Sequence, residues 1–370
     1  MENIEKLSGR NFSLKKKNIN SNLLKNEFKL FSLIAVLIFT SNIYSQTQNV
    51  LPDSSNPIFN STKTLKSQYL NPDLFTYAGQ RRYTLNGELP NLQTHIRPTT
   101  TAIIGGAYAG TLIWLHFHQA NAWWSGDRGK FHFQEDWVSA LQVDKAGHAF
   151  GAYFVSYLLS EGFLASGFSW DDATNWGTLM ALVYQTYVET EDGFAKNWGF
   201  SPSDWYADAT GSLFFIAQHY VPALQNITPK WQFVPSEWTG KPVINRPRTF
   251  IDDYNSSTFW WSVNVYNILP QKMKKYWVPW LDISLGYGAD AIDAPIDPKG
   301  PPDQLALRRY AIGLDYNLVK LLPDGGWFWN WFRQTLNYIK FPAPALEFQN
   351  NKVRFYLMYP FQISIGNFKF

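Results

Sequence analysis

One polar stretch constrains this chain more than any other. Asp144, Lys145 and His148 interrupt an apolar pattern that runs from Trp137 to Phe163 and predicts a helix. On a helix Asp144 and His148, four residues apart, lie on the same face. Asp is a poor residue inside a helix, and a buried carboxylate is costly unless it is paired. The fold must therefore supply partners for these groups, or the groups have a function.

Further polar residues lie near the ends of the next two apolar segments. Glu189 and Asp192 end one segment, and Gln185 lies one turn before Glu189. Asp204 and Asp208 lie one turn apart near the start of the following segment. We predict one polar site with Asp144, His148 and Glu189 as catalytic residues. We expect the binding residues of this site to be Lys145, Gln185, Asp192, Asp204 and Asp208.

Each of these residues also has a purely structural interpretation. Asp204 follows Ser201 by three residues, which is the spacing of a capping box. Glu189 and Asp192 could form a solvated helix end, although acids at a helix C-terminus oppose the helix dipole. Lys145 could reach solvent or pair with an acid, and a helical His such as His148 is often a hydrogen-bonded core residue.

The N-terminus has the form of an export signal. Several Lys residues precede an apolar run from Leu30 to Thr40, whose 11 residues are too few for a membrane span of roughly 20. We predict a signal peptide over residues 1–45. The mature protein should then lie in the cell envelope, in the periplasm or associated with the outer membrane.

Charge and cysteine content exclude several classes of function. Removing residues 1–45 takes away seven Lys/Arg and three Asp/Glu, which leaves 25 and 26 and a net charge near −1. No run of basic residues remains that could neutralise a phosphate backbone, so we expect no nucleic-acid partner. The absence of Cys excludes disulfides, thiolate metal ligands, a Cys nucleophile and a lipid-modified N-terminal Cys.

The patterns along the chain predict an α+β protein: an apolar four-helix bundle followed by a small antiparallel β region. Residues 46–98 are rich in Asn, Ser, Thr and Pro and should form a linker or a disordered arm. Residues 99–225 should form the helical domain, with helices at 100–117, 136–163, 173–189 and 201–220. Residues 226–370 alternate with period two at 261–265, 281–287, 310–316, 353–357 and 361–365. A terminal aromatic such as Phe370 is a feature of outer-membrane barrels, but about six strands are fewer than the roughly eight that such a barrel needs.

Several of these motifs together resemble the YfiM-like domain of unknown function, a family of envelope proteins. The resemblance extends from about Trp114 to the end of the chain, and a looser likeness links the helical part to VanZ-like membrane proteins. These resemblances imply an architecture and no established reaction. They rest on Asp144-Lys145-Ala146-Gly147-His148, Gly151-Ala152-Tyr153, Gln185 through Glu189, Asp192-Gly193-Phe194, Trp198-Gly199-Phe200-Ser201, Asp204, Gly211-Ser212, Asp253-Tyr254-Asn255 and Phe341-Pro342-Ala343-Pro344-Ala345-Leu346-Glu347.

Two functions remain open from the sequence. The first is a non-enzymatic envelope protein that binds a lipid or a cell-wall component through the helical bundle and its acidic/His site. The alternative is a metal- or acid-base-dependent hydrolase of an envelope substrate, because carboxylates combined with imidazole suit a divalent cation. A membrane or envelope lipid is the expected partner in either case.

Overall fold

The computed structural model describes residues 68–126, 128–239, 249–292, 306–365 and 368–369. The predicted signal peptide (1–45), residues 46–67 of the predicted linker, the loop from Asp293 to Asp303 and Phe370 lie outside the described residues. Residues 64–370 form one compact unit, so the predicted helical and β regions share that unit.

Four long helices follow two short strands along the described chain. Ser169 caps one of them by accepting a hydrogen bond from the Asp172 amide, and Ser201 caps another by accepting from the Asp204 amide. Among the described residues, no helix is both long and apolar enough to cross a membrane. The four helices are α2 (Pro98–Ala122), α3 (Val143–Ala165), α4 (Trp170–Phe194) and α5 (Pro202–Tyr220).

Helix α3 begins seven residues later than the sequence pattern predicts. Residues Ser139–Gln142 form a short 3-10 helix, η1, in which Ala140 and Leu141 have left-handed backbone angles. This break turns the chain just before Val143 and leaves Asp136 in the preceding loop. Asp144 and Lys145 therefore lie in the first turn of α3 rather than in its middle.

The second half of the chain is built on a six-stranded antiparallel sheet, in the order β3-β4-β5-β6-β7-β8. The first strand, β3, was not predicted, because Pro229 and Lys230 disguise its alternation; Pro229 is tolerated in a strand at the sheet edge. The strands are β3 (Ile227–Phe233), β4 (Ser257–Val263), β5 (Leu281–Asp290), β6 (Leu307–Tyr316), β7 (Ala345–Gln349) and β8 (Lys352–Tyr356).

Shorter elements connect these parts. Helix α8 follows β6 and is unusually aromatic. The short elements are β1 (Thr76–Tyr77), β2 (Gln80–Arg81), η2 (Pro222–Asn226), η3 (Ser236–Thr239), α6 (Val265–Ile268), η4 (Lys274–Tyr276), α7 (Leu318–Leu321), α8 (Trp327–Leu336), β9 (Ser364–Ile365) and β10 (Phe368–Lys369).

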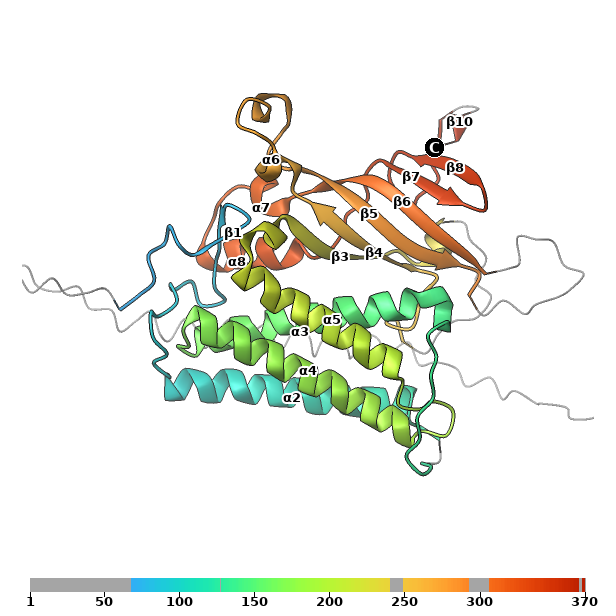
Figure 1. Ribbon diagram of the computed structural model, residues 1–370, viewed down its shortest axis with the longest axis horizontal. Coiled ribbons are helices and arrows are strands. Elements are labelled where there is room, and N and C mark those ends of the chain that lie inside the picture. Colours follow the sequence, from blue (N-terminus) through green and yellow to red (C-terminus); the bar gives the residue numbers. More distant parts are fainter. Residues whose placement is uncertain (1–67, 127, 240–248, 293–305, 366–367, 370) are drawn as a thin grey trace, which may run out of the picture. The chain divides into compact units, whose positions relative to one another are not determined.

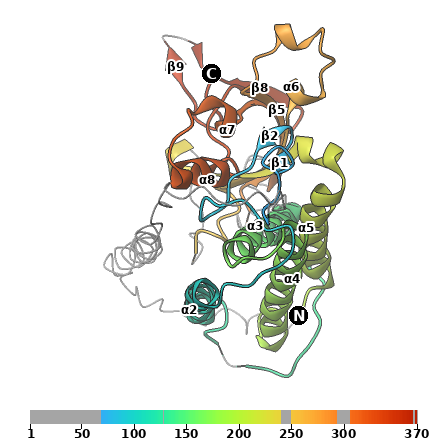
Figure 2. The ribbon, with the colours of Figure 1, turned by 90° about the vertical axis from the view of Figure 1, so that its left-hand side faces the viewer.

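Helices α3 and α5 lie beside each other next to the sheet, and α4 and α2 lie farther from it (Figures 1 and 2). Phe150 on α3 contacts Trp231 of β3 and Phe259 of β4, with ring centroids 6.3 Å and 5.9 Å away. Tyr153 and Tyr157 continue the same buried cluster towards Tyr338, which follows α8. The sheet thus covers a face of α3 that neighbouring helices would cover in a four-helix bundle.

The predicted four-helix bundle followed by a small β region is therefore wrong. The described residues contain seven α-helices, α2–α8, and a six-stranded antiparallel sheet that makes up a large part of a mixed α+β structure. Periodicity identified the long helices but not what covers them. The aromatic side of α3 needs more apolar cover than the other helices supply, and the sheet provides it.

The two faces of the sheet differ in character. One face carries Phe259, Trp261 and Leu285, and part of it packs on α3. The opposite face carries buried polar side chains that include Lys230, Asp282 and Asp315. The Lys230 ammonium lies 2.7 Å from the Asp315 carboxylate, so this interior is held by paired charges.

Candidate functional site

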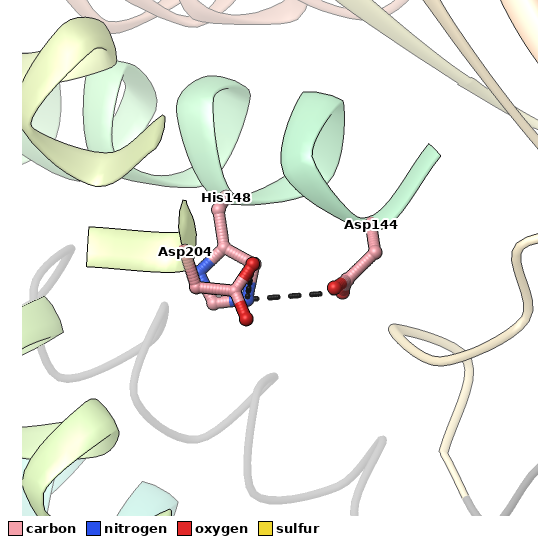
Figure 3. A group of neighbouring side chains, drawn as sticks. All are labelled: Asp144, His148 and Asp204. Atoms are coloured by element: carbon pink, nitrogen blue, oxygen red, sulfur yellow. Dashed lines mark ion pairs between the residues drawn. The ribbon is translucent and has the colours of Figure 1, made fainter. Parts of the chain in front are cut away.

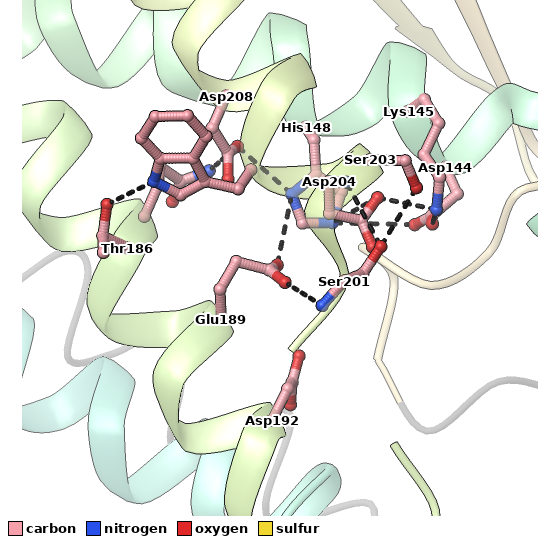
Figure 4. A network of polar contacts seen from close by, with 12 residues as sticks. Asp144, Lys145, His148, Thr186, Glu189, Asp192, Ser201, Ser203, Asp204 and Asp208 are labelled. Carbon is pink, nitrogen blue, oxygen red and sulfur yellow. Dashed lines mark hydrogen bonds and ion pairs between the residues drawn. The ribbon is translucent and has the colours of Figure 1, made fainter. Parts of the chain in front are cut away.

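The predicted site residues come from three helices that meet at the first turns of α3. Asp144, Lys145 and His148 lie in those turns, and the last turns of α4 and the first turns of α5 face them (Figure 4). At Gly211 of α5 a Cβ would lie only 1.9 Å from the Ala149 carbonyl oxygen. Only glycine allows this close crossing of α3 and α5, which positions α5 beside His148.

The imidazole of His148 has carboxylates at both ring nitrogens. Nδ1 lies 3.1 Å from Asp208 Oδ1 and 3.8 Å from Glu189 Oε1. Nε2 lies 3.8 Å from Asp144 Oδ1 and 3.7 Å from Asp204 Oδ1 (Figure 3). The ring is 22% exposed, whereas the four carboxylate side chains are at most 8% exposed. His148 therefore forms the accessible centre of a buried acidic cluster.

Lys145 neutralises the Nε2 side of this cluster. Its ammonium lies 2.8 Å from Asp144 Oδ2, 2.7 Å from Asp204 Oδ1 and 2.5 Å from Asp136 Oδ1. The side chain is only 6% exposed, so Lys145 pairs with acids and does not reach solvent. Burial disfavours its charge, but Asp144 and the other two acids raise the pKa of Lys145 above its usual value.

The Nδ1 side has no such counter-ion among the described residues. Asp208 Oδ1 accepts a hydrogen bond from Gln185 Nε2 at 2.8 Å, while its fully buried Oδ2 has no hydrogen-bond partner. Glu189 Oε2 accepts from the Ser201 amide at 3.2 Å. Two buried carboxylates thus share one imidazole, the only basic group near them in the part of the chain that the structure describes (Figure 4).

The pKa values in the cluster follow this asymmetry of charge. Burial raises the pKa of Glu189 to about 9 and that of Asp204 to about 7, against the opposing effect of His148. Burial also acts on Asp144, but His148 and Lys145 outweigh it and lower its pKa. Burial favours neutral His148, yet Asp208 and Asp144 raise its pKa well above the usual value. Without a further cation, the cluster relieves its excess of acids by holding protons.

Asp192 lies at the edge of the group rather than at its centre. Its Oδ1 accepts a hydrogen bond from the Trp124 indole at 2.6 Å. Burial raises the pKa of Asp192 to about 6, and the indole hydrogen bond opposes this. This contact ties the end of α4 to the chain just after α2.

The structure brings together all eight predicted site residues, but their predicted catalytic and binding roles stay predictions. Asp204 is part of both a helix cap and the acidic cluster. Its amide donates a hydrogen bond to Ser201, and its carboxylate pairs with Lys145. Two further participants were not predicted as site residues. Asp136 pairs with Lys145, and the Tyr254 hydroxyl donates a hydrogen bond to Asp144 Oδ1. The sequence offered one indication of a role for Tyr254, which is its place in the motif Asp253-Tyr254-Asn255 of the family resemblance.

The donor set fits a divalent cation. Two groups of three residues, Asp144/His148/Asp204 and His148/Glu189/Asp208, each place one donor atom within 4.8 Å of the others. Lys145 already neutralises the first group, so the second is the better cation site. One imidazole nitrogen and two carboxylates are typical ligands of Zn²⁺, Mn²⁺ and Fe²⁺. The unpartnered Oδ2 of buried Asp208 is an acceptor that such a cation would satisfy.

Comparison with known families identifies the region that holds this cluster. Residues 128–218 match the family DUF2279, described as "Predicted periplasmic lipoprotein". The protein is an exported protein of the cell envelope. This confirms the predicted localisation and shows that the α3–α5 region resembles an envelope domain whose function is unknown. The YfiM-like and VanZ-like resemblances stay predictions, and this sequence has no Cys that a lipid could modify.

Two other comparisons gave no relatives. No curated protein matches the chain, and no solved structure matches it.

Proposed function

We propose that this envelope protein binds a divalent cation between His148, Glu189 and Asp208 and uses it to hydrolyse an envelope substrate. The observation that carries the proposal is the excess of buried acid at His148 Nδ1. Asp208 and Glu189 converge there with no Lys or Arg contact from the described part of the chain, whereas Lys145 pairs with acids on the opposite side. A cation would replace the proton that Glu189, with its raised pKa, otherwise holds.

The surrounding residues suit the support of such a centre. With Nδ1 as a ligand, the Nε2 proton of His148 would face Asp144 and Asp204, which orient the ring and increase its basicity. Tyr254 and Lys145 hold Asp144, and Gln185 holds Asp208. A bound cation would supply Lewis acidity and a water of lowered pKa. The partly exposed imidazole gives a small reacting group access to that side of the cluster.

Metal analysis of the mature protein, purified without chelators, tests the cation site. We expect bound Zn²⁺, Mn²⁺ or Fe²⁺, and a rise in melting temperature when the metal is returned after chelation. The substitution His148→Ala should lower the affinity by at least about 100-fold, because it removes the only nitrogen ligand. His95→Ala is the matched control, since His95 is exposed and outside the cluster. Absence of bound metal, together with an unchanged melting temperature for every added cation, would refute the proposal.

Hydrolysis is tested separately with chromogenic ester and phosphodiester substrates. We expect activity that is lost with chelator, restored by the same cation and absent from His148→Ala. If the protein binds metal but hydrolyses neither substrate class, the proposed cation site stands and the proposed hydrolysis is refuted. The expected contact with a membrane or envelope lipid stays a prediction and does not depend on the cation site.

A further inference from the structure

An exposed apolar stretch connects β4 to β5 at the end of the sheet. Residues 265–280 include α6 and η4 and extend beyond the strands, as the segment beside the α6 label in Figure 1 shows. Four large apolar side chains in this stretch are strongly exposed. They are Ile268 (56%), Met273 (50%), Tyr276 (75%) and Val278 (41%).

The same stretch is strongly basic. Lys272, Lys274 and Lys275 lie between its apolar residues, and residues 265–280 contain no Asp or Glu. The Lys275 ammonium lies 4.7 Å from the centre of the Tyr276 ring, and Lys274 lies 5.1 Å from that of Tyr266. Lys320 of α7 adds a fourth positive charge, 5.2 Å from the same Tyr266 ring. Positive and apolar groups therefore form one continuous surface.

Internal hydrogen bonds hold this surface in shape. The Trp277 indole donates to the Leu281 carbonyl at 2.6 Å, and the Tyr276 amide donates to the Met273 carbonyl at 3.0 Å. Asn264 caps α6 by accepting from the Asn267 amide at 3.1 Å. These bonds constrain the backbone of the stretch, while the side chains of Met273 and Tyr276 are exposed. A surface that is preformed in this way loses little entropy when it binds.

We propose that residues 265–280 dock the protein onto the surface of an anionic phospholipid bilayer. Lysine ammonium groups beside aromatic and aliphatic side chains match the headgroup region, where the charge meets lipid phosphate and the apolar part enters the acyl boundary. Tyrosine and tryptophan favour this depth because they have an apolar ring and a polar atom. A protein of the cell envelope has such surfaces within reach. This docking surface is separate from the cation site and does not rest on it.

Vesicle co-sedimentation of the mature protein tests the docking surface. We expect binding to vesicles of phosphatidylcholine mixed with phosphatidylglycerol, weaker binding to phosphatidylcholine alone, and weakening by added NaCl. Each lysine at an anionic surface contributes about fivefold, so the triple variant Lys272→Gln, Lys274→Gln and Lys275→Gln should bind about 100-fold more weakly. The double variant Met273→Ser and Tyr276→Ser should lose about 10-fold, through lost apolar contact.

Two exposed apolar residues elsewhere provide matched controls. Leu74 precedes β1 and is 63% exposed, and Val353 on β8 is 60% exposed. Leu74→Ser and Val353→Ser should bind vesicles as the wild type does. Equal weakening by a control, unchanged binding by both stretch variants, or no vesicle binding by the wild type would each overturn the proposal. So would a stretch variant that changes the oligomeric state without lipid, since the surface would then contact a second copy.

A label placed in the stretch gives an independent measurement. Because the chain has no Cys, Tyr276→Cys can be labelled uniquely with an environment-sensitive dye. We expect a blue shift of the dye on addition of anionic vesicles, and none from a dye on Leu74→Cys. The opposite pattern would assign the lipid contact to another surface.

Discussion

At the scale of single residues, this protein buries several charged side chains in two places. The cluster at His148 is one example, and the polar face of the sheet is another. Asp282 lies opposite Asp315 across β5 and β6 and is only 3% exposed. The ammonium groups of Lys230 and Lys340 lie 2.7 Å and 3.6 Å from the Asp315 carboxylate. Charges in this interior must be balanced locally, because water cannot solvate them.

The titration of Asp282 predicts a specific dependence of stability on pH. Burial raises its pKa to about 7, helped by Asp315 and opposed by Lys230 and Lys320. The unfolded chain releases this proton near pH 4, so the stability that Asp282 contributes at low pH is lost as the pH rises to about 7. Asp282→Asn should therefore gain stability relative to the wild type over this interval, by on the order of a few kcal/mol.

Urea unfolding of both proteins at pH 4 and pH 8 measures this difference. Subtracting the free energy of unfolding of one protein from that of the other cancels the titration of the groups that they share. A difference that does not change with pH would mean that Asp282 stays ionised in the folded protein through its proximity to Lys230.

At the scale of elements, the site depends on how closely α3 and α5 cross. Asp208 lies one turn before Gly211, and His148 precedes the Ala149 carbonyl that Gly211 approaches. The crossing and the contact between His148 and Asp208 are therefore one geometric feature. By contrast, Gly105 on α2 has no atom within 4 Å of where its Cβ would be.

The same substitution at these two glycines should have opposite effects. Gly211→Ala should destabilise the protein by about 1–3 kcal/mol, because the helices must move apart, and should weaken cation binding. Gly105→Ala should be neutral or stabilising by up to about 1 kcal/mol, through better helix propensity. Thermal unfolding and metal titration measure both effects. Equal stability of the two variants would show that α5 can shift without cost.

At the scale of the whole molecule, helices and sheet share one core. Phe150, Tyr153 and Tyr157 of α3 lie in a cluster with Phe259 of β4 and Tyr338 after α8. Tyr254, which precedes β4, reaches back to Asp144. The cluster that includes His148 is therefore completed by a residue from the β region.

This shared core predicts that the helical region does not fold alone. The segment 99–225 should lack a cooperative thermal transition and should bind a hydrophobic dye, because its α3 aromatic face would lose its cover. Circular dichroism and dye fluorescence, compared with the mature chain, measure this. A sharp transition with native-like far-ultraviolet signal would instead support the predicted division of the chain near residue 225.

Local physics made much of this structure predictable from the sequence. Spacing alone placed Asp144 and His148 on one face, and the motifs at Ser169 and Ser201 identified two helix starts. Period-two alternation found parts of β4, β5, β6 and β8. These features depend on residues a few positions apart, so one sequence carries them directly.

Only the tertiary structure decided what surrounds those elements. It joined Asp136 and Tyr254 to the residues of α3, and it paired β3, with its Pro229, to β4 at the sheet edge. It also placed the sheet, rather than a closed bundle, against Phe150. These outcomes follow from how apolar area and buried charge are shared among separate segments of the chain, such as those of Asp144 and Tyr254. Local periodicity carries no information about such pairing.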